Sequence, residues 1–392
     1  MCMKRTVHLF KIISSLIIAC AVIVILRQYA YAEEDYSYIS DTDKLIDSLY
    51  SEAGADELIF ALPDSARGFL DNLYINDFKP ESAENLSAEN VISAILNVFR
   101  ESINEPIKIL ICIIGIIILT ALFDTLKSSD MSAGLEQTLS FVSVLCMSAV
   151  LSPAVLSLIT NLTETISVCS DFMMIYVPVI SLLIISGGNP VSGGMFYSTM
   201  IYMCSAVLRV VSEVIVPFLR CISSVAVITN ITDKVSLSGV NEMLRKAVRI
   251  LLTFCMSVFT AFLTMRSVIS VSQDSLSNRA VKFAISNFVP LVGGALSDAY
   301  QTVVSCTAVL RSGVGVIAIA AIFAVFLPAV AKCLIWQFTL MLGTAVCDVF
   351  SNGRLSSMLS SISSVISIIC SILLCTMVMY IISTAIILIV GG

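Results

Sequence analysis

Several charged side chains lie inside long apolar stretches of this sequence, where they could line a polar path through a membrane. The clearest are Asp171, Arg209, Glu213 and Asp298, which stand among mostly aliphatic neighbours. An ionisable group at membrane depth is costly unless it is paired or hydrated, so such a residue is a candidate for function. Arg209 and Glu213 are four residues apart and could pair on one helix face. These residues predict a polar pathway lined by Asp171, Glu213 and Asp298.

The same charges have a simpler interpretation, in which they lie at the membrane surfaces and extend their polar ends into water. Other ionisable residues in or beside apolar stretches fit this interpretation equally well: Arg220, Arg266, Arg311, Lys332 and Asp348. On the sequence alone both interpretations stay open.

The residue types that most enzymes and metal sites need are missing or scattered. The single histidine, His8, lies in an N-terminal leader. The cysteines beyond the leader lie in or beside apolar segments without a CxxC motif, so we interpret them as small buried hydrophobic residues. There is no GxxxxGK[ST] loop to cradle a phosphate. We therefore expect no catalytic residues, no metal site and no cofactor.

Composition places the chain among integral membrane proteins. Hydrophobic residues make up 58% of it and charged residues 13%, and the mean hydropathy is +0.98. The charges are unevenly distributed, because residues 33–105 contain 17 Asp or Glu and only 4 Lys or Arg. So acidic a region disfavours binding to nucleic acid.

Residues 1–32 have the order of parts that is typical of a secretory signal peptide. Basic residues precede an apolar run, and Ala30-Tyr31-Ala32 follows as a cleavage site. Two alternatives remain, namely lipidation at Cys20 and an uncleaved membrane anchor. Cleavage after Ala32 would leave the new N-terminus outside the cytoplasm.

Residues 33–105 predict two or three amphipathic helices in an acidic extracytoplasmic region. Apolar residues recur at helical spacing among acidic ones, as in Leu45, Ile46 and Leu49. Roughly 70 residues form only a marginal core. We therefore expect this region to lean on the membrane domain or on a partner. The simplest explanation of its acidity is a solvated surface. The sharper hypothesis is that a partner protein with a basic surface binds it.

Residues 106–392 consist of apolar runs long enough to cross a bilayer. A helix crosses roughly 30 Å of hydrocarbon with about 20 residues. The clearest runs are 107–123, 139–159, 166–185, 250–271, 313–334 and 362–390. Two regions are harder to assign: 336–350 is short, and 195–228 is either a hairpin or one long bent helix. The fold class predicted is an all-α polytopic membrane protein with about seven or eight spans.

The stretch 279–300 is the most individual in the chain. Pro290 disfavours helix at the residue before it, and Gly293 and Gly294 let the backbone bend, which predicts a broken or re-entrant helix. The alternative is a packing bend between two ordinary spans.

Lys and Arg in the short connections predict the orientation of the spans. An outside N-terminal region puts the connections 124–136 and 187–194 inside, and the basic segment 229–249 reads as cytoplasmic as well. Region 195–228 must then cross twice. Arg279 and Lys282 fall on the outer side against the rule, unless the stretch around them dips back into the membrane.

The same stretch carries a family resemblance. From Lys282 to Asp298 it reads Lys-Phe-x-x-Ser-Asn-Phe-Val-Pro-x-x-Gly and then Ser-Asp, and the chain also has a Ser186-Gly187-Gly188 loop, an Asn-Ile-Thr-Asp-Lys segment at 230–234 and a final Gly391-Gly392. In these features it resembles the stage III sporulation protein AE family of endospore-forming bacteria.

The resemblance implies an integral membrane component of the channel or secretion-like complex that links mother cell and forespore and supports late forespore gene expression. It also implies other stage III sporulation membrane proteins and ring-forming proteins as partners, in the mother-cell membrane around the forespore. Small residues in the spans would suit homo-oligomer contacts. The alternative is a stand-alone secondary transporter for a small solute, which the buried charges and the broken helix favour.

Overall fold

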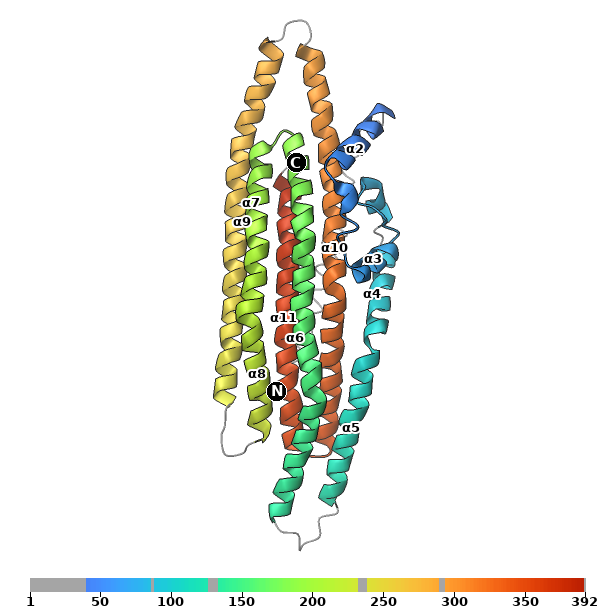
Figure 1. Cartoon of the computed structure of the whole chain (residues 1–392), viewed down its shortest axis with the longest axis vertical. Helices are drawn as coiled ribbons and strands as arrows, with labels where there is room; N and C mark the ends of the chain where they lie inside the picture. The colour runs from blue at the N-terminus through green and yellow to red at the C-terminus, as the bar shows by residue number, and fades with distance from the viewer. Residues whose placement is uncertain (1–39, 86–87, 126–132, 232–237, 289–292, 391–392) are drawn as a thin grey trace.

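The chain folds into a tall bundle of antiparallel helices with a small helical region packed against one side (Figure 1). This computed structural model describes residues 40–85, 88–125, 133–231, 238–288 and 293–390. Every regular element in these residues is a helix. The N-terminal region, residues 40–102, contains α2 (Ser40–Glu52), η1 (Ala55–Glu57), α3 (Asp64–Asp71), η2 (Pro80–Asn85) and α4 (Ala88–Ser102). The predicted signal peptide, residues 1–32, lies outside the described residues.

The bundle consists of long helices joined by short connections. They are α5 (Asn104–Thr125), α6 (Ala133–Ser186), α7 (Pro190–Arg209), η3 (Val210–Ile215), α8 (Val216–Ile231), α9 (Ser238–Phe288), α10 (Gly293–Val349) and α11 (Gly353–Val390). Because η3 continues directly into α7 and α8, these three form one rod. Six helices in the described residues are long and apolar enough to cross a membrane. The predicted all-α membrane class is confirmed, with fewer candidate spans than the seven or eight expected.

The number differs because two pairs of expected spans are single helices. Runs 139–159 and 166–185 both belong to α6, which has 54 residues, and runs 313–334 and 336–350 both belong to α10, which has 57. The polar residues between the runs of α6 end the hydropathy signal, but they include no Gly or Pro to end the helix. Thr163, for example, donates its hydroxyl to the carbonyl of Ile159 at 3.2 Å.

Region 195–228 is a continuous rod, so the expectation that it crosses twice is wrong. Its middle, η3, is a π-helix, and the N–H of Val216 donates to the carbonyl of Val211, five residues back. Pro217 follows directly. A proline in a helix lacks a donor and crowds the carbonyl four residues before it, here that of Glu213. The wider turn accommodates that crowding without ending the helix.

Successive helices therefore alternate in direction along the bundle. The end of α5 and the start of α6 lie at one end of the bundle, as do the end of α8 with the start of α9 and the end of α10 with the start of α11 (Figure 1). The end of α6 with the start of α7, and the end of α9 with the start of α10, lie at the other end, toward the N-terminal region. The expectation that 124–136 and 187–194 lie on the same side is wrong, because the single helix α6 separates them. The described parts of the basic segment 229–249, the end of α8 and the start of α9, lie at the end away from the N-terminal region without any double crossing.

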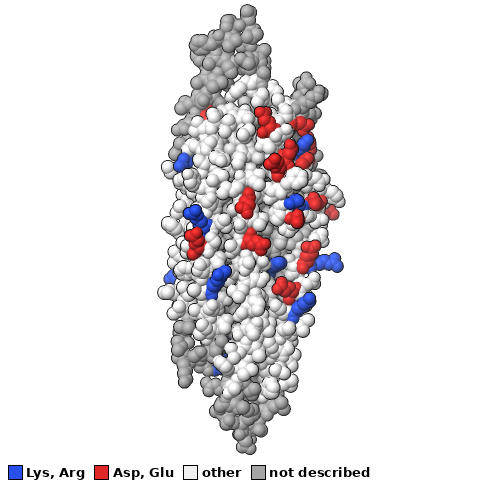
Figure 2. Space-filling view, viewed as in Figure 1, with Lys and Arg blue, Asp and Glu red and all other residues white. Residues whose placement is uncertain are grey.

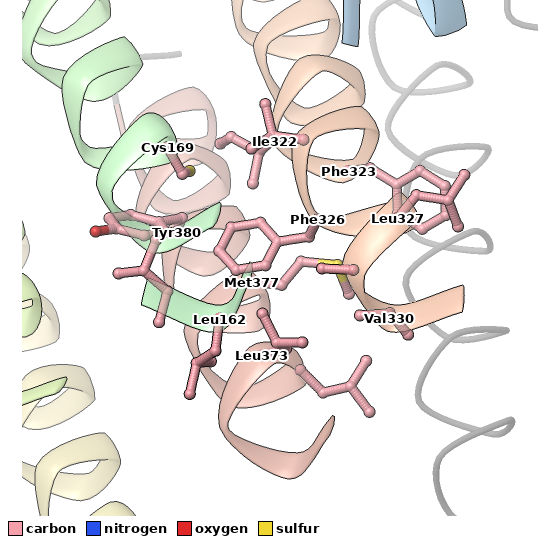
Figure 3. Close-up of a cluster of buried hydrophobic side chains, with 14 of the residues drawn as sticks. Leu162, Cys169, Ile322, Phe323, Phe326, Leu327, Val330, Leu373, Met377 and Tyr380 are labelled. Atoms are coloured by element: carbon pink, nitrogen blue, oxygen red, sulfur yellow. The ribbon is translucent and has the colours of Figure 1, made fainter. Parts of the chain in front are cut away.

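Helix α10 is the axis of the bundle. In its most apolar window 94% of the residues are buried, against 22% in α5. Its side chains Ile322, Phe323, Phe326, Leu327 and Val330 form a cluster with Leu162 and Cys169 of α6 and with Leu373, Met377 and Tyr380 of α11 (Figure 3). The rings of Phe326 and Tyr380 lie 6.4 Å apart. This strongly apolar helix is thus covered by protein.

The N-terminal region completes that cover, and so it leans on the membrane domain as expected. Phe69 of α3 contacts Phe323 of α10, with ring centroids 6.1 Å apart, and Phe78 contacts Phe172 of α6 at 6.3 Å. A Cβ atom added to Gly313 of α10 would lie 2.6 Å from the Cα of Pro80. The backbone of the N-terminal region therefore touches α10 directly.

A buried tyrosine holds the N-terminal region together internally. The Tyr50 hydroxyl accepts a hydrogen bond from the Phe78 N–H at 3.1 Å and donates to the Ala55 carbonyl at 3.3 Å. The pKa of Tyr50 is raised to about 12, mainly by burial; the Phe78 hydrogen bond lowers it, and the nearby Asp77 and Asp56 add smaller increases. The fold therefore favours the neutral phenol.

Replacing Gly313 with leucine is expected to separate the N-terminal region from α10. The new side chain would overlap Pro80, and such overpacking costs about 1–3 kcal/mol. The thermal midpoint of the purified protein should fall, and limited proteolysis should release residues 40–102 faster. Gly115→Leu is the matched control, because a Cβ atom there meets nothing within 4 Å. Equal midpoints and equal cleavage rates for the two variants would contradict this packing.

Raising the pH should destabilise the N-terminal region through Tyr50. Because the folded pKa lies above the ordinary value of 10.0, the contribution of Tyr50 is complete below pH 10 and is lost as the pH rises toward 12. Urea unfolding at pH 9 and pH 11 should show a loss of roughly 1 kcal/mol that Tyr50→Phe lacks. Lysines titrate in both proteins, so the difference isolates the phenol. An equal loss in the two proteins would count against the buried hydroxyl.

Candidate functional site

Three of the four charged residues singled out in the apolar stretches lie on the surface of the bundle. Asp171 of α6, Arg209 at the end of α7 and Glu213 of η3 are all exposed. Figure 2 shows charged side chains around the middle of the molecule, with largely uncharged surface below them. Asp298 belongs to α10, but its side chain lies outside the described residues. The pathway therefore stays a prediction, and Asp171 and Glu213 do not meet inside the bundle.

Arg209 and Glu213 do not form the expected ion pair. Among the described residues, the ion pairs within 4.0 Å are Arg67–Asp64 and Lys79–Asp47. The four-residue spacing brings two side chains together on a regular α-helix. The π-helix begins directly after Arg209, so the turn between the two residues is wider than an α-turn.

The predicted break at 279–300 is a reversal between two long helices. Helix α9 ends at Phe288, and α10 begins with Gly293 and Gly294 as its first two residues. Pro290 lies between them, outside the described residues. Helices α9 and α10 run in opposite directions on either side of this point, so the helix is interrupted within the predicted stretch (Figure 1). The re-entrant path that was the other form of the prediction falls on residues 289–292, outside the described residues.

A buried carboxylate that the sequence patterns did not single out holds the α6–α7 turn, residues 187–189. Asp274 of α9 is only 2% exposed. Its Oδ1 accepts from the N–H of Val191 at 3.0 Å, and its Oδ2 accepts from the N–H of Ser192 at 2.7 Å. These donors belong to the first turn of α7, whose N–H groups have no partner within the helix. A negative charge there also interacts favourably with the helix dipole.

The other side of the same turn packs tightly on α10. A Cβ atom on Gly187 would lie 2.8 Å from the hydroxyl oxygen of Thr307, and Gly188 has a φ of +84°, which favours glycine. Gly193 is as close to the carbonyl of Ser181, at 2.8 Å. The Ser-Gly-Gly loop is therefore a contact point of α6, α7, α9 and α10, and Asp274 and Thr307 hold it from two sides.

Only a weak signal in the sequence points to this clamp. Asn189 directly precedes α7, but its side chain does not cap the helix. The N–H groups of the first turn therefore need an acceptor from elsewhere. That acceptor is 82 residues away from Ser192, in a polar stretch that we did not assign to a membrane span. No local spacing rule connects the two segments.

Most other buried polar groups in the described part of the bundle are uncharged hydroxyls and amides, and Arg311 is the exception. Arg311 of α10 is 5% exposed and lies near enough to Tyr176 of α6 to act on it electrostatically. Ser170 and Tyr380 share a hydrogen bond of 2.8 Å between α6 and α11. Of the cysteines described, Cys112, Cys146 and Cys221 are exposed rather than buried, and none forms a disulfide. No three His, Cys, Asp or Glu side chains within the described ranges are grouped to hold a metal.

Replacing Asp274 with alanine is expected to loosen the α6–α7 turn. Two buried N–H groups would lose a charged acceptor, which costs about 2–4 kcal/mol. The measurement is hydrogen exchange at the Val191 and Ser192 amides, which should become faster, together with a lower thermal midpoint. Asp274→Asn keeps one acceptor oxygen and should have a smaller effect. Asp171→Asn, at an exposed site, is the control, and unchanged exchange in Asp274→Ala would rule out the clamp.

Comparisons with known proteins identify relatives of the chain. The family model described as stage III sporulation protein AE matches residues 72–391. The curated stage III sporulation protein AE of Bacillus subtilis (strain 168) is 22% identical over 335 residues, which cover 84% of this chain and 82% of the relative. No solved structure matches the chain. The matched residues include Phe78 and Pro80 of the N-terminal region, the Asp274 clamp and all the candidate spans. Because the match covers most of the chain, the chain belongs to the stage III sporulation protein AE family.

Proposed function

We propose that this protein is an integral membrane component of the channel or secretion-like complex that connects mother cell and forespore during endospore formation. In this role it supports gene expression in the forespore after engulfment. The observation that carries the proposal is the family match over residues 72–391, which includes nearly the whole bundle. The protein acts as a structural part of the complex and not as an enzyme.

The dimensions of the bundle favour a part that extends away from the membrane. Helices α9 and α10 have 51 and 57 residues. At about 1.5 Å per residue they are roughly 75–85 Å long, more than twice the 30 Å of a bilayer's hydrocarbon. A bundle of this length projects beyond the lipid and can reach ring-forming partners and other stage III sporulation membrane proteins between the two membranes.

The N-terminal region supplies a surface for such partners. Acidic side chains gather over it (Figure 2), and Asp56, Glu57, Asp64 and Asp71 are exposed. Its apolar side is already covered by α6 and α10, so the acidic side remains for a partner. A protein with a basic surface fits it, whereas nucleic acid is disfavoured.

The distribution of basic residues supports an extracytoplasmic N-terminal region in the mother-cell membrane. The segment 229–249, at the end away from that region, contains Lys234, Arg245, Lys246 and Arg249, and the α6–α7 turn at the near end contains no charge. Cytoplasmic connections are enriched in Lys and Arg. Arg279 and Lys282 remain on the side of the N-terminal region, against this rule.

The transporter alternative needs charged groups that line a path through the protein. Asp171 and Glu213 instead lie on the outer surface. The contacts that enclose α10 and clamp the α6–α7 turn favour a rigid structural part over a transporter that alternates between open states.

Deleting the coding sequence in its spore-forming host should leave engulfment complete while a fluorescent reporter of late forespore transcription stays dark and the forespore shrinks. Wild-type protein should restore the reporter, and Asp274→Ala should fail to do so if the clamp holds the protein in its working shape. Normal sporulation together with a nutrient or ion defect in growing cells would refute the proposal.

A matched pair of charge variants separates the two functions in the same strain. Asp171→Asn and Glu213→Gln should complement fully if the protein is a structural part. Loss of the reporter in both variants, at normal protein levels in the membrane, would favour the transporter.

Labelling of Ser65→Cys by an impermeant maleimide from outside intact cells checks the side on which the N-terminal region lies.

A further inference from the structure

A cavity of about 270 Å³ lies where the N-terminal region meets the bundle. Ser65 of α3 forms one wall, Glu164 of α6 the second and Lys332 of α10 the third. These residues are far apart in the sequence and meet only because the N-terminal region packs on both helices. The cavity is separate from the Asp274 clamp.

One end of the cavity carries charges of both signs that do not pair with each other. Glu164 and Lys332 form no ion pair within 4.0 Å, since the ion pairs of the described residues lie elsewhere. Ser65 and Asn161 line the same space, and within the described part of the chain no hydrogen bond joins either side chain to another residue. Four polar groups therefore have bonding capacity available for a small molecule.

The opposite end is apolar. Val168 lies one turn from Glu164 on α6, and Val325 lies two turns from Lys332 on α10, and both line the cavity. Pro328 lies between Val325 and Lys332 on α10 and also lines the cavity.

We propose that this cavity binds a small zwitterion, whose anionic group contacts Lys332 and whose ammonium group contacts Glu164. Glu164 is exposed and Lys332 is half-buried, so the cavity opens to the surface. A zwitterion places an opposite charge beside both residues, whereas a ligand with one charge does so for only one of them. At about 30 Å³ per water molecule the cavity has room for roughly nine non-hydrogen atoms, which is the size of an amino acid. An aliphatic amino acid also has an apolar end for Val168 and Val325.

Two sources carry this chemistry, namely a free amino acid and the phosphoethanolamine headgroup of a membrane lipid. Both present one ammonium and one anionic group on a short frame. In either case the ligand touches the N-terminal region, α6 and α10 together, so binding should stabilise the contact among them. The site does not depend on the role in sporulation.

The test is calorimetric titration of the purified full-length protein in phosphatidylcholine nanodiscs. L-Leucine should bind, and isoamylamine and 4-methylpentanoate, which each lack one charge, should bind at least roughly tenfold more weakly. Glu164→Gln and Lys332→Gln should each weaken leucine binding by a similar factor. Glu105→Gln and Lys108→Gln are the matched controls, because this exposed pair at the start of α5 lies outside the cavity.

A second set of measurements identifies the source and guards against misfolding. If O-phosphoethanolamine binds and leucine binding disappears in phosphatidylethanolamine nanodiscs, the ligand is the lipid headgroup. If leucine still binds in those nanodiscs, the ligand is a free zwitterion. Val168→Phe fills the cavity without changing its charge and should abolish binding at an unchanged thermal midpoint. The proposal is overturned if neither zwitterion binds, or if leucine binds Glu164→Gln, Lys332→Gln and Val168→Phe as it binds the wild type.

Discussion

The enclosure of α10 by protein is the constraint on which the rest of the structure depends. Lipid is as apolar as this helix, so the hydrophobic effect does not by itself drive other helices onto it, and close packing must do so. Small residues make the approach possible. A Cβ atom on Gly343 would lie 3.1 Å from the side chain of Ile113 of α5 and 3.3 Å from that of Leu359 of α11, and Gly313 lies against Pro80. Through these two glycines α10 comes close to α5, to α11 and to the N-terminal region.

The N-terminal region shows the same dependence from the other side. Its own helices are short, and α3 has only eight residues. A segment of this size forms a marginal core alone. Phe69 and Phe78 extend that core onto Phe323 and Phe172 of the bundle. The apolar residues of the N-terminal region therefore continue the core of the bundle.

Local sequence patterns predicted much of the fold and little of the candidate site. Apolar runs located the helices, and Pro290 with the glycines after it marked the reversal between α9 and α10. The same method divided α6 in two, because Glu164 and its polar neighbours lower hydropathy without ending a helix. The site escaped prediction because its partners come from separate helices: Asp274 meets Ser192, and Glu164 shares a cavity with Lys332. Charges in apolar runs, which were the more obvious signal, lie mainly on the surface.

The contact between Pro80 and Gly313 also bears on the order in which the protein is made. The two residues are separated by roughly 230 positions, so the N-terminal region is synthesised long before the helix that completes its core. During that interval Phe69 lacks its partner Phe323 of α10. The final helices of the chain thus decide when its first domain becomes stable.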